Sequence, residues 1–284
     1  MTAVGANIWI WESPITDRAI AEIAPRVKKL GFDLIELPVE EPGGWDPRGA
    51  AEVLAEHGLG ASLCCVMPPG RDLAVSDREV VGTTQDYLLH CVDVAATISS
   101  PVVAGPMYAA VGRLWRLSDG ERPRLLARVA EALRPVAEHA GERGIQLAIE
   151  PLNRYETSLI NTVEQGLELV SAVDSSACGL LLDTFHMNIE EKDPAAAASA
   201  AGAEIAHVHA CGTDRGAPGA DRFDWPGFSA ALGGAGYAGP LCIESFTADN
   251  ETIATAASIW RPLAASPDQL AANGLRFLRA TFSA

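Results

Sequence analysis

The stretch QLAIEPLNRYETSLINTVEQGLELVSAVDSSACGLLLD, residues 146–183, contains one strand–helix–strand unit. Short apolar runs at Gln146–Glu150 and Gly179–Asp183 predict buried strands, and the segment from Thr162 to Val173 between them predicts a helix. Two buried strands joined by a helix are typical of a parallel βαβ unit. The stretch therefore predicts a parallel sheet that is covered by helices.

The same alternation extends toward both ends of the chain and occurs about eight times. Eight units in 284 residues average about 35 residues each, which favours an α/β fold of the (β/α)8 TIM-barrel type. An open, doubly wound sheet is the alternative, but it would prefer a glycine-rich turn after the first strand, where this chain has Trp11–Pro14. The other predicted strands are Ala6–Ile10, Asp33–Leu37, Ala61–Cys65, Val102–Gly105, Ile205–His209 and Leu241–Glu244. The other predicted helices are Asp17–Leu30, one that begins at Asp46-Pro47, Ser76–Ile98, Asp119–Arg143, Ala195–Ala201, Trp225–Leu232 and Asp268–Phe282.

Length and composition bound the domain organisation. Hydrophobic residues make up 48% of the chain and charged residues 20%, so the chain can bury a sizeable core. A typical domain size would suggest roughly two domains, but α/β barrels of about 250 residues form one unit. Because no linker or low-complexity segment divides the chain, we expect a single domain over residues 1–284.

Charge and hydropathy exclude several classes of partner. The net charge of −16 would repel phosphate backbones, so we expect no nucleic-acid partner. No apolar run reaches the roughly 18 residues that a membrane span needs, so we expect no membrane partner. The first residues lack the basic segment of a secretion signal, and we expect a cytoplasmic protein. Only three lysines are present, which disfavours Schiff-base chemistry, and the six cysteines form no CxxC pair.

Four polar residues end four successive predicted strands: Glu150, Asp183, His209 and Glu244. Their spacings of 33, 26 and 35 residues correspond to one βα unit each. In a barrel these strand ends surround one mouth, at the face where such folds carry out chemistry. Side chains alternate along a strand, so Glu150 shares the inner face with Gln146 and Ala148, and Leu147 and Ile149 face the helices.

Three carboxylates and one imidazole in a low-dielectric mouth need a compensating charge. One such residue alone is more often a cap or an ion-pair partner, but four with matching parity favour a site for one divalent cation. Oxygen donors with one nitrogen suit Mn²⁺, Mg²⁺ or Co²⁺. Nearby, His207 is predicted one layer deeper, Glu36 either lines the pocket or is structural, and Trp9 and Trp11 either line the pocket or pack in the core.

Further polar residues follow these strand ends: Glu156 in IEPLNRYET, His186 in DTFHMNIEE and Arg215 in HACGTDRGAPG. We expect them on loops of the mouth, where substrate hydroxyls would be bound. Each of these residues alone is equally consistent with a solvated loop position.

These motifs together resemble the D-tagatose 3-epimerase / D-psicose (allulose) 3-epimerase family, in the xylose-isomerase-like TIM-barrel superfamily. The resemblance also covers LGFDLIELPVEE, GPMYAAVGR and IWRPL, and so spans essentially the whole chain. It implies that Glu150, Asp183, His209 and Glu244 hold one divalent metal ion, with Mn²⁺ expected first and Co²⁺ or Mg²⁺ as alternatives. It implies that Glu150 and Glu244 are also the catalytic acid/base pair, and that Glu156, His186 and Arg215 bind the sugar. It further implies a homodimer or homotetramer.

The resemblance predicts a metal-dependent ketose 3-epimerase that inverts C3 of a free ketohexose or ketopentose through a cis-enediolate. An aldose–ketose isomerase and an inosose dehydratase-like lyase are alternatives, because both could use the same four ligands. A metal-dependent endonuclease is disfavoured by the charge of −16 and by the six histidines, and a sugar-binding protein without activity is disfavoured by the complete ligand set. The first loop, WESPIT at Trp11–Thr16, lacks the extra aromatic residues that relatives often carry there, so the preferred ketose stays open.

Overall fold

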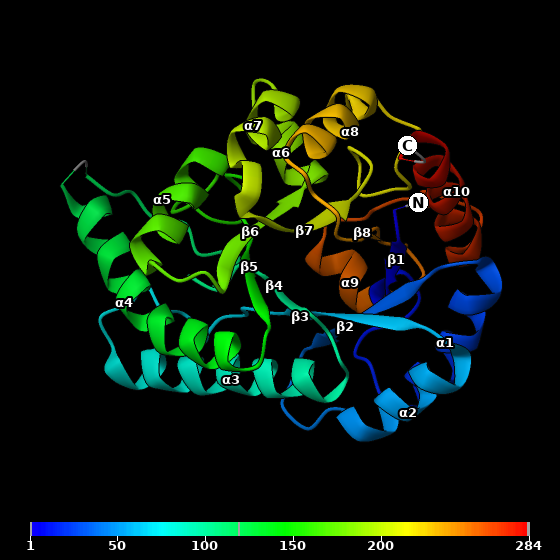
Figure 1. Cartoon of the computed structure of the whole chain (residues 1–284), viewed down its shortest axis with the longest axis horizontal. Coiled ribbons are helices and arrows are strands. Elements are labelled where there is room, and N and C mark those ends of the chain that lie inside the picture. Colours follow the sequence, from blue (N-terminus) through cyan, green and yellow to red (C-terminus); the bar gives the residue numbers. More distant parts are fainter. Residues whose placement is uncertain (1, 119, 283–284) are drawn as a thin grey trace.

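Eight parallel strands close into a barrel within residues 2–118 and 120–282, which the computed structural model describes (Figure 1). The strands pair in chain order, and β8 pairs back with β1. This arrangement confirms the predicted TIM barrel. The strands are β1 (Val4–Asn7), β2 (Leu34–Val39), β3 (Gly60–Cys65), β4 (Val102–Gly105), β5 (Gln146–Ile149), β6 (Cys178–Asp183), β7 (Ile205–Ala210) and β8 (Leu241–Ile243).

Helices surround the barrel (Figure 1), and most begin at a side chain that caps free backbone N–H groups. Asp46, as predicted, caps the helix whose first residue is Pro47, and Thr16 and Ser266 cap two others. The helices are α1 (Asp17–Leu30), α2 (Pro47–His57), α3 (Arg78–Thr97), α4 (Glu121–Glu142), α5 (Val163–Val173), α6 (Thr184–Glu190), α7 (Pro194–Ala201), α8 (Trp225–Gly234), α9 (Glu251–Ala256) and α10 (Pro267–Thr281).

Three local elements differ from the sequence predictions. The first strand ends at Asn7 rather than Ile10, because the Asn7 side chain accepts a hydrogen bond from the N–H of Trp9 and starts the short 3-10 helix η1 (Ile8–Ile10). The segment after Asp183, predicted as a loop, forms helix α6, and α9 follows β8 where no helix was predicted. Residues 1, 119, 283 and 284, which belong to the predicted single domain, lie outside the described residues, and so does the predicted helix start at Asp119.

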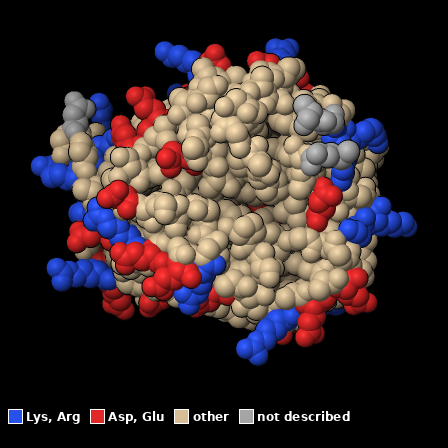
Figure 2. Space-filling view, in the orientation of Figure 1, with Lys and Arg blue, Asp and Glu red and all other residues tan. Residues whose placement is uncertain are grey.

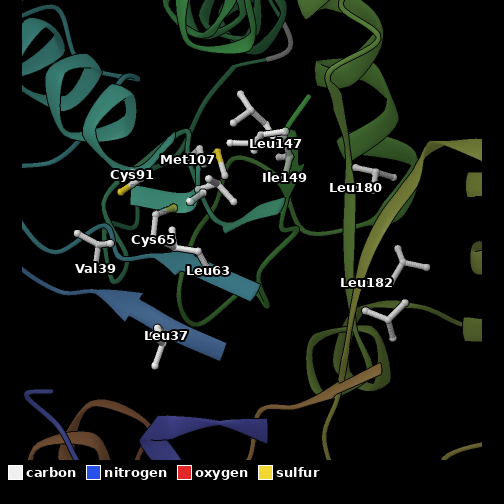
Figure 3. Close-up of a cluster of buried hydrophobic side chains, with 14 of the residues drawn as sticks. Leu37, Val39, Leu63, Cys65, Cys91, Met107, Leu147, Ile149, Leu180 and Leu182 are labelled. Atoms are coloured by element: carbon white, nitrogen blue, oxygen red, sulfur yellow. The ribbon is translucent and has the colours of Figure 1, made fainter. Parts of the chain in front are cut away.

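Strand parity separates the core from the barrel interior as predicted. Leu147 and Ile149 on β5 and Leu180 and Leu182 on β6 are buried in the hydrophobic core between strands and helices (Figure 3). The other parity of β6 places Asp183 inside the barrel, paired in register with His209 on β7. The same alternation therefore fills the outer core and positions the polar residues of the mouth.

On one face of the molecule, the charged side chains lie mainly around the rim (Figure 2). In the view of Figure 2, the Lys, Arg, Asp and Glu side chains lie around the rim, and the centre of this face is mostly uncharged. Within the described ranges, no helix combines the length and the apolar character that crossing a membrane requires.

Candidate active site

The four predicted strand-end residues converge at the mouth of the barrel. Each of Glu150, Asp183, His209 and Glu244 offers one ligand atom, and these atoms all lie within 4.8 Å of one another. All four side chains are buried. They come from the carboxyl ends of β5, β6, β7 and β8, so four neighbouring strands of the closed sheet bring them together.

The imidazole of His209 fits a metal ion at this position. Its Nε2 atom lies 2.8 Å from Glu36 Oε1, and a carboxylate can only accept there, so Nε2 carries a proton. Its other nitrogen, Nδ1, is buried without a hydrogen-bond partner among the described residues and lies 3.5 Å from Glu244 Oε2. An unpartnered nitrogen beside three carboxylates is the donor set that a divalent cation would complete.

Burial and the neighbouring charges shift the pKa values of the clustered carboxylates. Burial raises the pKa of Glu150 well above its ordinary value, and the negative charges of Glu244 and Asp183 raise it further. Burial also acts to raise the pKa of Glu244, but the positive charges of His209 and Arg215 outweigh it, so the pKa of Glu244 is lowered. A bound cation would stabilise all these carboxylates in their ionised form.

Arg215 reaches into the same cluster from the loop after β7. Its Nη1 donates to Asp183 Oδ2 at 2.8 Å and to Glu244 Oε2 at 3.0 Å. Each carboxylate oxygen has a second lone pair, so the guanidinium and a cation can share these oxygens. The guanidinium also lies 4.1 Å from the centre of the Phe185 ring. Arg215 has a backbone φ of 65°, a left-handed conformation that is strained in a residue with a large side chain.

His186 lies on helix α6, directly after the strand that ends at Asp183. Donors face both of its ring nitrogens: the backbone N–H of Asn153 lies 3.1 Å from Nδ1, and Nη2 of Arg215 lies 3.0 Å from Nε2. Nε2 also lies 3.5 Å from Glu150 Oε1. Burial lowers the pKa of His186 to about 3, so this imidazole is neutral at physiological pH. The Asn153 side chain also donates to Glu156 Oε1 at 2.7 Å and so connects two of the predicted sugar-binding residues.

These residues surround a cavity of about 300 Å³, which is within the size range of small-molecule sites. The other wall of the cavity is largely apolar and comes from the first strands and α9, which lies over the barrel in Figure 1. Trp9 lines this wall and donates from Nε1 to Glu40 Oε1 at 2.9 Å. Trp11 does not line the cavity, because its Nε1 is bound to Asp268 at the surface side of the barrel.

Glu36 and His207 lie within the barrel and not among the residues that line the cavity in the described chain. Both are fully buried. Burial acts to raise the pKa of Glu36, but the positive charges of His209 and His207 outweigh it and lower the pKa well below its ordinary value. His207 therefore lies one layer deeper than His209, as its parity predicts.

The structure brings all seven predicted site residues together. Six of them line the cavity, and the seventh, Asp183, lies beside them in contact with Arg215. The roles assigned to them stay predictions. Sequence reasoning did not single out Asn153, which lies inside IEPLNRYET, or Phe246, which lies two residues after Glu244. A count of polar and aromatic residues just after strand ends could have found both.

Comparison with known proteins assigns this chain to a family. The sequence model of the family described as "Xylose isomerase-like TIM barrel" matches residues 24–281. A Synechocystis sp. protein named "Probable ketose 3-epimerase" is 36% identical over 280 residues, which cover 98% of this chain and 96% of the relative. An Arthrobacter globiformis "Ketose 3-epimerase" is 31% identical, with 97% and 95% covered.

A solved structure of a related epimerase has the same fold. The crystal structure of a D-allulose 3-epimerase from Methylomonas sp. superposes with a TM-score of 0.92 at 28% identity and covers 99% of this chain and 98% of that chain. The relatives are named for an isomerase reaction, so the chain is an enzyme of the isomerase class. The chain belongs to the ketose 3-epimerases of the xylose isomerase-like TIM-barrel family.

Proposed function

We propose that this enzyme uses one divalent metal ion to invert C3 of a free ketose, either a ketohexose such as fructose/allulose or tagatose/sorbose, or a ketopentose. The observation that carries the proposal is the cluster of Glu150, Asp183, His209 and Glu244 on one small cavity. A sugar substrate is supported by relatives solved in complex with D-allulose and in the presence of D-fructose. Two further relatives are named L-ribulose 3-epimerase, which keeps a ketopentose in the substrate set.

The metal would be held by one oxygen from each of the three carboxylates and by Nδ1 of His209. Mn²⁺ is the expected ion and Co²⁺ or Mg²⁺ are alternatives, because three of the four donors are carboxylate oxygens and the cluster contains no cysteine. When bound, such an ion supplies Lewis-acid stabilisation of the negative charge that develops on the sugar oxygens.

Glu150 and Glu244 are proposed to move the proton at C3. The C3–H bond is weakly acidic because C3 neighbours the C2 carbonyl. One glutamate starts ionised and takes the C3 proton. The electron pair of the broken C3–H bond forms the C2–C3 double bond, and the π pair of the C2 carbonyl moves to its oxygen, which gives the enediolate. The other glutamate starts protonated and gives its proton to the opposite face of C3. The C2 carbonyl is then restored and C3 is inverted, with no net gain or loss of atoms. Which glutamate acts as the base depends on the epimer.

His186, Arg215 and Glu156 are proposed to hold the sugar oxygens. Neutral His186 can present a proton on Nε2 when Nη2 of Arg215, 3.0 Å away, turns to the sugar, and Arg215 presents donors that cannot lose their proton. Both can donate to an oxygen on which negative charge develops. Glu156 can accept from a hydroxyl group, and Asn153 fixes its position.

The test is an epimerisation assay on metal-stripped protein with a panel of ketoses, with and without Mn²⁺, in D₂O. We expect Mn²⁺-dependent inversion with solvent deuterium at C3. The variants Glu150→Gln and Glu244→Gln should each lower the rate by at least about 10²–10⁴-fold, and Glu142→Gln on the far end of α4 is the matched control. Near-normal rates in both active-site variants would refute the mechanism, and deuterium at C1 or C2 with aldose formation would identify an isomerase instead.

Two further proposals concern assembly. We infer that residues 1–284 form one domain, because the barrel closes between β1 and β8, and a single cooperative unfolding transition is the expected result. We also infer a homodimer or homotetramer. The inference rests on the resemblance to the epimerase family, and light scattering at a monomer mass would refute it.

A further inference from the structure

A buried carboxylate joins two imidazoles inside the barrel. Glu36, on β2, accepts a hydrogen bond at Oε1 from His209 Nε2 and at Oε2 from His207 Nε2, both at 2.8 Å. Asn7 Nδ2 donates to the same Oε1 at 3.0 Å. All of these side chains are essentially inaccessible to solvent, with at most 1% of each residue exposed. Glu36, His207, His209 and Asn7 therefore form hydrogen bonds with one another and not with bulk water.

We propose that Glu36 is a positioning residue for the metal site: it keeps the proton of His209 on Nε2, so that Nδ1 is free to bind the metal. A histidine that binds a metal ion is neutral and carries one proton, and the acceptor that it meets decides which nitrogen keeps that proton. Without Glu36, the proton can move to Nδ1, where Glu244 Oε2 at 3.5 Å would accept it. A protonated Nδ1 cannot be a ligand.

His207 and Asn7 hold Glu36 in place. His207 binds one carboxylate oxygen and Asn7 the other, so a rotation of the carboxylate would break both contacts. Asn7 also accepts a hydrogen bond from the N–H of Trp9, whose side chain lines the cavity. The Glu36 group therefore connects the metal site to the opposite wall of the cavity.

Two substitutions separate the hydrogen bond from the charge of Glu36. Glu36→Ala removes the acceptor and the charge. Glu36→Gln keeps a carbonyl oxygen that can accept from Asn7 and His209, and its NH₂ group can donate to His207 Nε2 once His207 carries its proton on Nδ1. Asp72→Asn is the matched control, because Asp72 is a buried, hydrogen-bonded carboxylate that pairs with Arg113 and does not itself line the cavity.

The inference rests on the proposed function, so its first test uses metal-free protein. NMR of ¹⁵N-histidine-labelled protein should show two slowly exchanging, low-field Nε2–H signals, from His207 and His209. Both should persist in Asp72→Asn, and the His209 signal should be lost in Glu36→Ala. Absence of an Nε2–H signal for His209 in the unaltered protein would overturn the inference, whether or not the protein binds metal.

The second test is Mn²⁺ titration followed by the EPR signal of the free ion. We expect Glu36→Ala to weaken Mn²⁺ binding about 10–100-fold, Glu36→Gln to weaken it less, and Asp72→Asn to leave it unchanged. A role in stability alone would lower the melting temperature of Glu36→Ala without changing its Mn²⁺ affinity, and that result would overturn the inference. If Glu36→Ala does not fold, Glu36→Gln replaces it: the His209 Nε2–H signal and the Mn²⁺ affinity should be kept together or lost together, and a change in one without the other would overturn the inference. If the unaltered protein binds no Mn²⁺ but shows both Nε2–H signals, the metal-dependent function fails and the arrangement of Glu36 stands.

Discussion

Replacement of Asp183 by asparagine should remove most of the thermal stabilisation that Mn²⁺ gives this enzyme. An ion that binds only the folded state stabilises it by about 2.7 kcal/mol at about 100 times its Kd. For 284 residues, an unfolding entropy of about 2.1 cal/mol/K per residue gives about 600 cal/mol/K for the chain. Dividing the stabilisation free energy by this unfolding entropy gives a rise in Tm of about 4–5 °C for the unaltered enzyme.

The asparagine variant should show a shift below about 1 °C at the same Mn²⁺ concentration, because a neutral amide oxygen is a weaker ligand than a carboxylate. The fold should survive, since Asp183 Oδ1 caps α6 by accepting from the N–H of Phe185 and asparagine caps as well as aspartate. Asp193→Asn is the control, because Asp193 caps α7 in the same way, at the exposed surface.

The assay is differential scanning calorimetry of metal-stripped protein with stepwise addition of Mn²⁺ and then of a chelator. The Asp193→Asn protein should behave like the unaltered enzyme. A full shift in Asp183→Asn, or no shift in the unaltered enzyme at saturating Mn²⁺, would refute the assignment of this cluster as the metal site.

Three further outcomes are expected. Tyr108→Phe should lower the free energy of unfolding by about 1–3 kcal/mol in chemical denaturation, because the buried Tyr108 hydroxyl hydrogen-bonds with the carbonyl oxygens of Glu150 and Ile160; no loss would show that these contacts contribute nothing. Mn²⁺ affinity should fall as the pH falls through the raised pKa of Glu150, since the metal needs the carboxylate and the proton competes for it; a titration that is independent of pH would contradict this. Glu40→Gln should raise KM more than it lowers kcat in steady-state kinetics, because Glu40 lines the cavity and accepts a hydrogen bond from Trp9, which also lines it; a fall in kcat alone would place Glu40 in the chemistry.

The fold was predictable from local patterns, and the misses have local causes. The eight strands follow from short apolar runs. The parity of Glu150 and Asp183 follows from the alternation of side chains along a strand. Helix α6 was missed because Asp183 ends a strand and caps a helix at once, so no loop residues separate the two elements. Helix α9, ETIATA, is too short for a periodic apolar pattern to be visible.

The candidate site was predictable as a set of residues but not as a network of contacts. Parity indicated that Glu36, His207 and His209 face inward, but 171 residues separate Glu36 from His207, and nothing in the spacing names the pair. The hydrogen bond between Asn153 and His186 likewise depends on how the loop after β5 folds over α6. Register and loop conformation are properties of the closed barrel, and they became visible only there.

The four candidate ligands come from β5 to β8, whereas Trp9, Glu40 and Val66 on the facing wall follow β1, β2 and β3. The second half of the gene thus encodes all seven candidate site residues, and the first half encodes the part of the facing wall that α9 does not supply. Libraries confined to the first half could explore new sugars while the reactive half is inherited intact. Chimeras that join the first half of one relative to the second half of another would exchange this part of the wall and Glu36 while they keep all seven candidate site residues.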